Sequence, residues 1–247
     1  MPNIKLILSY DGTDFAGFQS QVDQRTIEDE LKLAIRKIEK KDKVTIYCAG
    51  RTDTGVHAEE QVINFYTEQQ NMEPFNWIMA MNSLLPHDIR VIQCELVANE
   101  FNARRSAIKR EYWYHLYNGP FISALQYRYA AHYPKILSLD KLQQYIPYFI
   151  GEHDFTSFCA STDSSFSKVR RIESFFIEKK NDQFIFKITG NAFLHHMIRT
   201  IIGTILNMVK NDEDPAKIEK LIKVKDRNQA GPTYYACGLV LKRVYYS

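Results

Sequence analysis

The sequence has few of the residues that mark secreted, zinc-binding or linker-rich proteins. Its four cysteines lie far apart and form no C-x-x-C pair, so neither a disulfide framework nor a cysteine zinc site is expected. The seven histidines form no H-x-x-x-H or H-E-x-x-H pattern, which argues against a metal centre. Ten glycines and eight prolines in 247 residues exclude a collagen-like or linker-dominated chain.

Long apolar runs are also absent. No run approaches the roughly 20 residues that a membrane-spanning helix needs, and residues 1–12 do not form a secretory signal, so we expect a cytoplasmic protein with no membrane partner. A hydrophobic content of 45% with 25% charged residues excludes a disordered chain. The net charge of +3 permits nucleic-acid binding but does not require it.

The first half of the sequence predicts the element order β-α-β-β-α-β. Short runs rich in β-branched residues predict strands at 4–10, 44–48, 61–67 and 89–97. Thr26 is a suitable N-cap for a helix whose apolar residues recur at helical spacing from Ile27 to Ile38. A second helix is expected over 75–84, before Pro86.

The second half repeats that order. Strands are expected at 109–117, 168–178, 183–189 and 239–246, and helices at 139–150 and 193–209, with a turn at Asn181-Asp182. We therefore predict an α/β (α+β type) fold of two ferredoxin-like βαββαβ halves, residues 1–105 and 106–247. Sheets lying edge to edge could form a long cleft with their open faces.

The loop at residues 50–55 carries a candidate catalytic aspartate. Its G-x4-G spacing resembles a phosphate-binding loop, but Val56-His57 stands where that motif needs Lys and then Ser or Thr. G-x-G-x-x-G and G-x-S-x-G are absent, which excludes common dinucleotide and hydrolase sites. A loop aspartate such as Asp53 ordinarily makes an Asx-turn. The glycines on both sides admit a bulky ligand, and Arg51 could keep the carboxylate ionised, so Asp53 is also a candidate nucleophile or base.

The segment 101–117, FNARRSAIKREYWYHLY, interleaves basic and aromatic residues. Guanidinium groups bind phosphates and aromatic rings stack on unpaired bases, so this composition is typical of nucleic-acid contacts. The same rings also suit a strand in which Tyr112 and Tyr114 face a core while Trp113 and Tyr117 cover the other face. We expect both roles, with one tyrosine at an edge facing a ligand.

The expected helix at 193–209 carries a cation inside its apolar stripe. Arg199 normally needs a partner there; Asp53 is one candidate, and a pair within the helix is the ordinary alternative. His195 and His196 are adjacent, and adjacent helical residues point in different directions. We therefore interpret these histidines as cap or surface groups rather than metal ligands.

Together these segments closely resemble the tRNA pseudouridine synthase A (TruA) family, and the resemblance covers nearly the whole chain. It rests on these motifs in order: YDGTDFAGFQSQ (10–21), GRTDTGVHA (50–58), NSLLPHDIRV (82–91), FNARRSA and REYWYHLYN (101–118), GEHDFTSFCA (151–160), NAFLHHMIRTIIG (191–203) and AGPTYYACGL (230–239). The sequence departs from the family's usual residues at Phe18, Glu28, Thr54 and Tyr234-Tyr235, none of which is a catalytic group.

The resemblance implies an isomerase that converts uridine to pseudouridine at positions 38, 39 and 40 of the tRNA anticodon stem-loop, with no metal and no cofactor. It implies the pseudouridine synthase fold, a central RNA-binding cleft, and a homodimer whose tRNA spans both subunits. The catalytic aspartate falls on Asp53, and Arg51 would help to displace the target base. The stacking tyrosine falls on Tyr112, and the late-helix cation falls on Arg199, which is expected to pair with Asp53.

Other classes of function fit parts of the pattern. A non-catalytic RNA-binding protein could use βαββαβ units, but the K/R-G-F/Y-G/A-F-V-x-F/Y strand of RNA-recognition modules is absent. A small-molecule α/β enzyme predicts a cofactor signature, and none is present. Within the enzymes, a pseudouridine synthase for another RNA position is the alternative.

Overall fold

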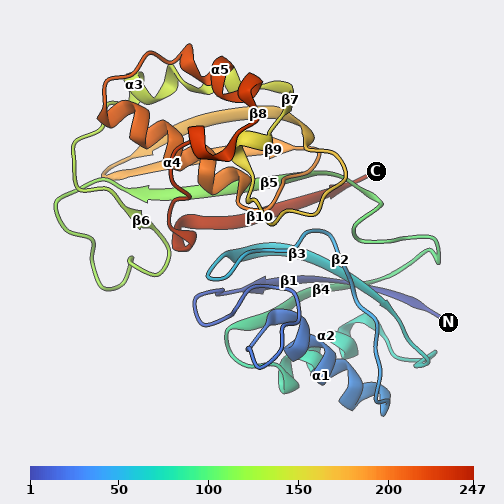
Figure 1. The fold of residues 1–247 in the computed structure, drawn as a ribbon. Helices are drawn as coiled ribbons and strands as arrows, with labels where there is room; N and C mark the ends of the chain where they lie inside the picture. Colours follow the sequence, from blue (N-terminus) through green and yellow to red (C-terminus); the bar gives the residue numbers. More distant parts are fainter. The chain divides into compact units, whose positions relative to one another are not determined.

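The chain forms two units, and its last strand returns to the first. The computed structural model (Figure 1) describes all 247 residues; unit 1 contains residues 1–108 and 240–247, and unit 2 contains residues 109–239. The final strand therefore lies in unit 1, whereas the sequence pattern groups it with the second half. None of the helices is both long enough and apolar enough to cross a bilayer.

Unit 1 has the β-α-β-β-α-β order that the sequence predicts. The elements are β1 (Asn3–Tyr10), α1 (Ile27–Glu39), β2 (Tyr47–Cys48), β3 (His57–Tyr66), α2 (Pro74–Leu84) and β4 (Ile89–Val97). The predicted strand at 44–48 is confirmed only for its last two residues. Strand β3 begins four residues earlier than expected, directly after the 50–55 loop.

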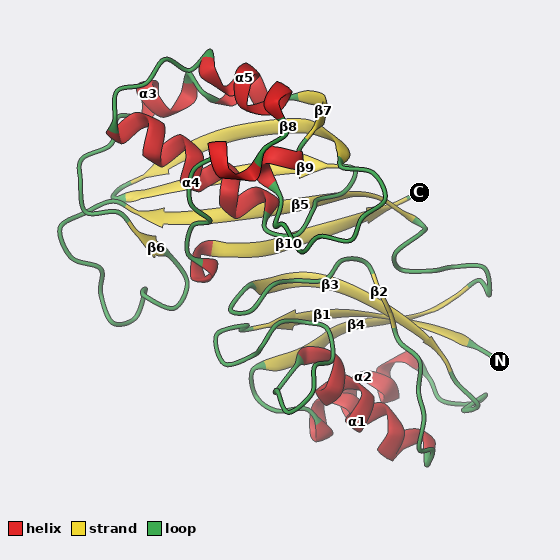
Figure 2. Cartoon of the chain, viewed as in Figure 1, coloured by secondary structure: helices red, strands yellow, loops and turns green.

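The sheet of unit 1 has a ferredoxin-like strand order. Strands β4, β1 and β3 are antiparallel neighbours, and β2 pairs antiparallel with β3 at Tyr47↔Asn64. The returning strand β10 (Leu239–Tyr246) pairs parallel with the start of β3 at Val240↔His57. Figure 2 shows α1 and α2 on one face of this sheet.

Local signals explain both helices of unit 1. The Thr26 side chain caps α1 by accepting a hydrogen bond from the Asp29 N–H, as the sequence predicts. Pro74 begins α2, where its missing N–H costs nothing, and Trp77 and Met81 are fully buried on the inner side.

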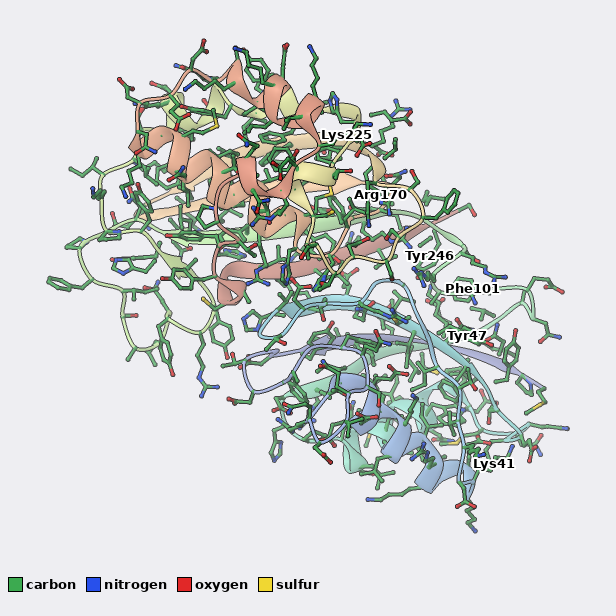
Figure 3. All side chains as sticks on the ribbon, in the orientation of Figure 1. Lys41, Tyr47, Phe101, Arg170, Lys225 and Tyr246 are labelled. Carbon is green, nitrogen blue, oxygen red and sulfur yellow. The ribbon has the colours of Figure 1, made fainter.

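The end of β10 is anchored within unit 1 by aromatic contacts. The Tyr246 and Phe101 rings, labelled in Figure 3, lie 5.1 Å apart between centroids, and the Tyr246 hydroxyl donates to the Ala103 carbonyl at 2.9 Å. Lys5 Nζ lies 5.2 Å from the Tyr246 ring centroid, a cation–π distance.

Unit 2 contains its own set of mainly antiparallel strands, with helices packed on them. Its elements are β5 (Ala107–Tyr117), β6 (Ala131–His132), α3 (Leu139–Gln143), β7 (Gly151–Asp154), β8 (Val169–Lys180), β9 (Gln183–Gly190), α4 (Met197–Lys210) and α5 (Lys217–Val224). The sheet order is β5-β9-β8-β7, with β6 parallel to the end of β5. The α/β class is confirmed, but the second half does not simply repeat the predicted order, because it also contains β6, β7 and α5. The RNA-binding cleft stays a prediction.

Two helix predictions in unit 2 are wrong at their ends. The expected helix at 139–150 stops at Gln143, and a 3₁₀ turn at Ile146–Phe149 follows, because Pro147 has no N–H with which to continue the helix. The expected helix at 193–209 begins only at Met197, because His196 has a left-handed backbone with φ 64°. The predicted turn at Asn181 is confirmed, with φ 53°.

Candidate functional site

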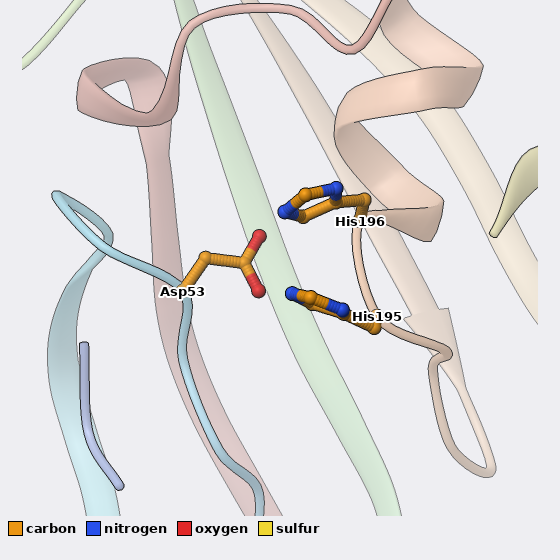
Figure 4. Close-up of side chains that lie close together, drawn as sticks. All are labelled: Asp53, His195 and His196. Atoms are coloured by element: carbon orange, nitrogen blue, oxygen red, sulfur yellow. The ribbon is translucent and has the colours of Figure 1, made fainter. Parts of the chain in front are cut away.

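Asp53 lies on the loop between β2 and β3 (Figure 4) and is half-buried. Its carbonyl accepts a hydrogen bond from the Val56 N–H at 3.1 Å, which closes a tight turn. Gly55 within that turn has φ 75°, a conformation that favours glycine. The sequence motif therefore produces a short turn that presents one carboxylate.

The residue before Asp53 is held by a buried network of side chains. Thr52 is 7% exposed, and its hydroxyl lies 2.8 Å from the hydroxyl of Tyr10 at the end of β1. Gln61 of β3 donates both to the Tyr10 hydroxyl, at 3.2 Å, and to the Gly50 carbonyl, at 2.7 Å. Burial raises the pKa of the Tyr10 phenol well above its ordinary value, so this group stays neutral. The network ties the loop to two strands.

A second chain segment fixes the loop from its other side. The Phe18 N–H donates to the Thr52 carbonyl at 3.0 Å, and the Phe18 ring is buried in the core. Gly17 has φ 98°, and a Cβ there would lie 3.0 Å from that carbonyl and 3.2 Å from the Thr54 nitrogen. Only a glycine permits this close approach, so the 10–18 segment and the Asp53 loop form one rigid assembly.

Arg51 does not orient Asp53 in the way that the sequence suggests. Its side chain is exposed and forms no ion pair with the Asp53 carboxylate. The backbone turn and the Thr52 anchor hold the loop that carries Asp53. Arg51 is thus unconstrained by the fold and available for a ligand.

Tyr112 lies on β5 in unit 2, where it is 8% exposed. Its ring packs edge-on against Phe193, with centroids 5.2 Å apart. The neighbouring Arg110 donates from Nη1 to the Asn191 carbonyl at 2.7 Å, which ties the strand to the segment before α4. The burial of Tyr112 agrees with the core role that we expect, and its ligand role stays a prediction.

His195 and His196 lie on the segment that leads into α4 (Figure 4). Their ring centroids are 4.0 Å apart, so the expectation that they point in different directions is wrong. The left-handed backbone of His196 takes the pair out of the helix and turns the rings toward each other. The interpretation that these histidines are not metal ligands stays a prediction.

Arg199 in the first turn of α4 is tied to the chain near its end. Its Nε donates to the Tyr234 carbonyl at 2.9 Å, and the Tyr234 N–H donates back to the Arg199 carbonyl at 3.0 Å. This reciprocal pair fixes the guanidinium against unit 2. The predicted pairing of Arg199 with Asp53 stays a prediction.

Asp163 is a positioning residue that the sequence pattern does not reveal. Its carboxylate accepts from the His195 N–H at 2.8 Å and from Lys168 Nζ at 2.5 Å. Burial disfavours its ionised form, but the Lys168 and backbone hydrogen bonds outweigh that effect and hold its pKa well below the ordinary range. Asp163 therefore anchors the turn from which α4 starts.

The two units thus present different chemistry. Unit 1 offers a rigidly mounted carboxylate with an exposed guanidinium two residues away. Unit 2 offers the Tyr112 ring and a second guanidinium, that of Arg199, which backbone contacts fix. A carboxylate can act as nucleophile or base, while guanidinium and aromatic groups hold phosphates and bases, which suits chemistry on a nucleotide.

Comparison with known proteins agrees with this chemistry. A family model described as tRNA pseudouridine synthase matches residues 6–104 and 146–247. The chain is 42% identical over 248 residues to tRNA pseudouridine synthase A of Brachyspira hyodysenteriae, covering 100% of this chain and 99% of that protein. It is 40% identical over 244 residues to tRNA pseudouridine synthase A of Bacillus pumilus, covering 98% of each chain. It is 37% identical over 247 residues to tRNA pseudouridine synthase A 1 of Bacillus cereus, covering 100% of each.

Proposed function

The chain belongs to the tRNA pseudouridine synthase family, and we propose that it isomerises uridine to pseudouridine at positions 38, 39 and 40 of the tRNA anticodon stem-loop, with Asp53 as its catalytic residue. The observation that supports this proposal is that hydrogen bonds hold the Asp53 loop in place, in a sequence that matches tRNA pseudouridine synthases A along its whole length. The single carboxylate sits where Tyr10 and Gly17 hold the loop from two sides.

The reaction is balanced without a cofactor. The C1′–N1 bond of the nucleotide breaks, the uracil turns, and a C1′–C5 bond forms; N1 gains a proton, and C5 loses one. There is no net oxidation or reduction, and the only exchange is of protons with water, so a carboxylate can carry out the reaction without a cofactor. Asp53 can attack C1′, attack C6 of the base, or remove a proton from C2′, and all three routes require it within contact of the sugar or base.

The other candidate residues bind the substrate. A uridine must leave its stack to reach a carboxylate, which costs a few kcal/mol. We assign Tyr112 to stacking on the displaced uracil, because it supplies an aromatic ring that the edge contact with Phe193 holds in place. Arg51, exposed and without an ion pair to Asp53, fills the place that the base leaves. Arg199 holds a charged group of the RNA or the Asp53 carboxylate.

The proposal extends to the assembly. We propose that the enzyme works as a homodimer in the cytoplasm, with one tRNA in contact with both subunits. Its motifs supply one catalytic carboxylate per chain, so a dimer carries two. Equilibrium sedimentation of the enzyme with and without tRNA tests this: two chains per particle supports the dimer, and one chain contradicts it.

Mapping the product tests the function. Unmodified tRNA transcripts are incubated with the enzyme in the absence of added metal or cofactor, then treated with a carbodiimide that marks pseudouridine as a reverse-transcription stop. Stops confined to positions 38 to 40 support the proposal. Stops at other positions indicate a synthase with a different target, and binding without any stop indicates a non-catalytic RNA-binding protein.

A further inference from the structure

Unit 2 contains an open pocket of about 600 Å³ that the roles assigned above leave unused. Its lining comes from the loop before β8, from the residue that precedes α4 and from the segment that follows α5. The residues that line it are Ala160, Ser161, Thr162, His196, Arg227, Asn228, Ala230, Gly231 and Pro232. The pocket is open to solvent, so a group on a large ligand can reach it.

Arg227 is the only lining residue with a fixed positive charge, and no carboxylate neutralises it. Its Nη1 donates to the Gly231 carbonyl at 2.9 Å and to the Ala230 carbonyl at 3.5 Å, and its Nη2 donates to the Thr233 hydroxyl at 3.1 Å. A guanidinium has five N–H donors, so these three bonds leave two for a ligand. All of its partners in the chain are neutral oxygens, so the charge itself remains available.

The pocket wall that carries Arg227 is rigid. A Cβ on Gly203 of α4 would lie 1.8 Å from the Pro232 carbonyl oxygen, and the Gly231 N–H donates to the Thr204 hydroxyl at 2.9 Å. The same segment continues to Tyr234, whose carbonyl accepts a hydrogen bond from Arg199 Nε. The segment that carries Arg227 is therefore also the one that the substrate-binding candidate Arg199 of α4 contacts.

The remaining lining groups also suit an anion. None of the lining residues is acidic. The side chains of Ser161, Thr162 and Asn228 are exposed and form no hydrogen bond within the chain, so they can donate to a ligand. The two carboxylates next to the pocket in sequence are already engaged, Asp163 with Lys168 and Asp226 with the Asn228 N–H.

From this arrangement we infer that the pocket binds a phosphodiester group of the RNA substrate, with Arg227 as the charged contact and Ser161, Thr162 and Asn228 as neutral donors. Arginine, serine, threonine and asparagine side chains are the usual partners of nucleic-acid phosphates, and they fix the register of the RNA without reading its sequence. The inference rests on the proposed function for the identity of the RNA. It assigns to the pocket the positioning of the backbone of the tRNA.

A negative charge introduced into the pocket tests directly whether the pocket binds a phosphodiester group. Arg227 also holds the 230–233 segment, so the variants of choice are Asn228→Asp and Ser161→Asp, which add a negative charge on two different lining segments without removing a hydrogen bond. Asn181→Asp and Ser164→Asp make the same changes at exposed positions outside the pocket. The dissociation constant for the tRNA transcript should rise about tenfold in both pocket variants and less than about twofold in both controls.

A second measurement identifies the group that is bound. Stem-loop RNAs carrying one neutral methylphosphonate linkage at a time should reveal a linkage whose neutralisation weakens binding to the unaltered enzyme but not to Asn228→Asp. Equal affinities of pocket and control variants, or the absence of such a linkage, would overturn the inference. Pseudouridine formation by the unaltered enzyme is scored separately: its absence refutes the proposed function, whereas unchanged binding by the pocket variants refutes only the phosphate site.

Discussion

The hydroxyl of Tyr10 lies 2.8 Å from the hydroxyl of Thr52, in a buried hydrogen bond directly beside Asp53. This contact joins the end of β1 to the candidate catalytic loop across 42 positions of sequence. Because Gln61 of β3 also donates a hydrogen bond to the Tyr10 hydroxyl, this one phenol links β1, β3 and the loop. The position of the carboxylate thus depends on a residue that does no chemistry.

Tyr10→Phe should lower both stability and activity, because it leaves the buried Thr52 and Gln61 groups without their partner. We expect a loss of about 1 kcal/mol in the free energy of unfolding, or about 2–4 °C in Tm. Turnover should fall more than tRNA affinity, since the loop carries Asp53. Tyr47→Phe removes an exposed hydroxyl without a hydrogen bond and serves as the control. Equal Tm and turnover in both variants would contradict the anchoring role.

Gly17→Ala should displace the Asp53 loop. The added Cβ would meet the Thr52 carbonyl at 3.0 Å, and φ 98° is strained for any residue with a Cβ. We expect destabilisation of about 1–3 kcal/mol and a larger loss of kcat than of affinity for tRNA. Urea unfolding and single-turnover kinetics measure the two effects; a variant with unchanged kcat would show that the close approach is unimportant to catalysis.

Asp163→Asn should change how stability depends on pH. The folded pKa of Asp163 lies below its unfolded value of about 3.9, so its contribution is complete above that value and is lost as pH falls through the folded pKa. At pH 7 the variant should lose about 1.5–3 kcal/mol, the usual worth of hydrogen bonds to a charged group. The difference from the unaltered enzyme should shrink below about pH 4. Urea unfolding across pH tests this, with the exposed Asp182→Asn as control; a constant difference down to the lowest pH contradicts it.

Tyr112 should act through its ring rather than its hydroxyl. Tyr112→Phe preserves the edge contact with Phe193 and should bind and convert tRNA nearly as the unaltered enzyme does. Tyr112→Ala removes the stacking surface, which is worth about 1–3 kcal/mol per base, so turnover should fall by about 5-fold to 150-fold. Turnover lost equally in both variants would assign the role to the hydroxyl instead.

Local patterns account for most of the predicted fold. Strand β4 and helix α1 agree with their predicted bounds, because β-branched runs, helical spacing and the Thr26 cap act within a few residues. The predicted start of α4 is wrong because it depends on a contact between residues that are distant in sequence. Phe193 and Leu194 continue its apolar spacing, but Asp163, 32 positions earlier, binds the His195 N–H and supports the turn that delays the helix.

The residues of the candidate site also differ in whether the local sequence indicates them. Asp53 stands out in the sequence because two glycines bracket it, and Tyr112 because basic and aromatic residues surround it. Asp163 and Arg227 carry no local signal, since their roles depend on Lys168 and Gly231 contacts that exist only after folding. Arg51 shows the converse, because closeness in sequence to Asp53 does not produce an ion pair.

The most direct test of Asp53 as the catalytic residue is the release of tritium from tRNA transcripts labelled at C5 of uridine, with no added metal or cofactor. Asp53→Asn keeps the size of the side chain and removes its charge, and Asp42→Asn makes the same change at an exposed site without hydrogen bonds. We expect release by the unaltered enzyme and by Asp42→Asn, and at least about 10³-fold less by Asp53→Asn, with tRNA binding retained in all three. Release by Asp53→Asn at the rate of the Asp42→Asn control would show that the chemistry belongs to another residue.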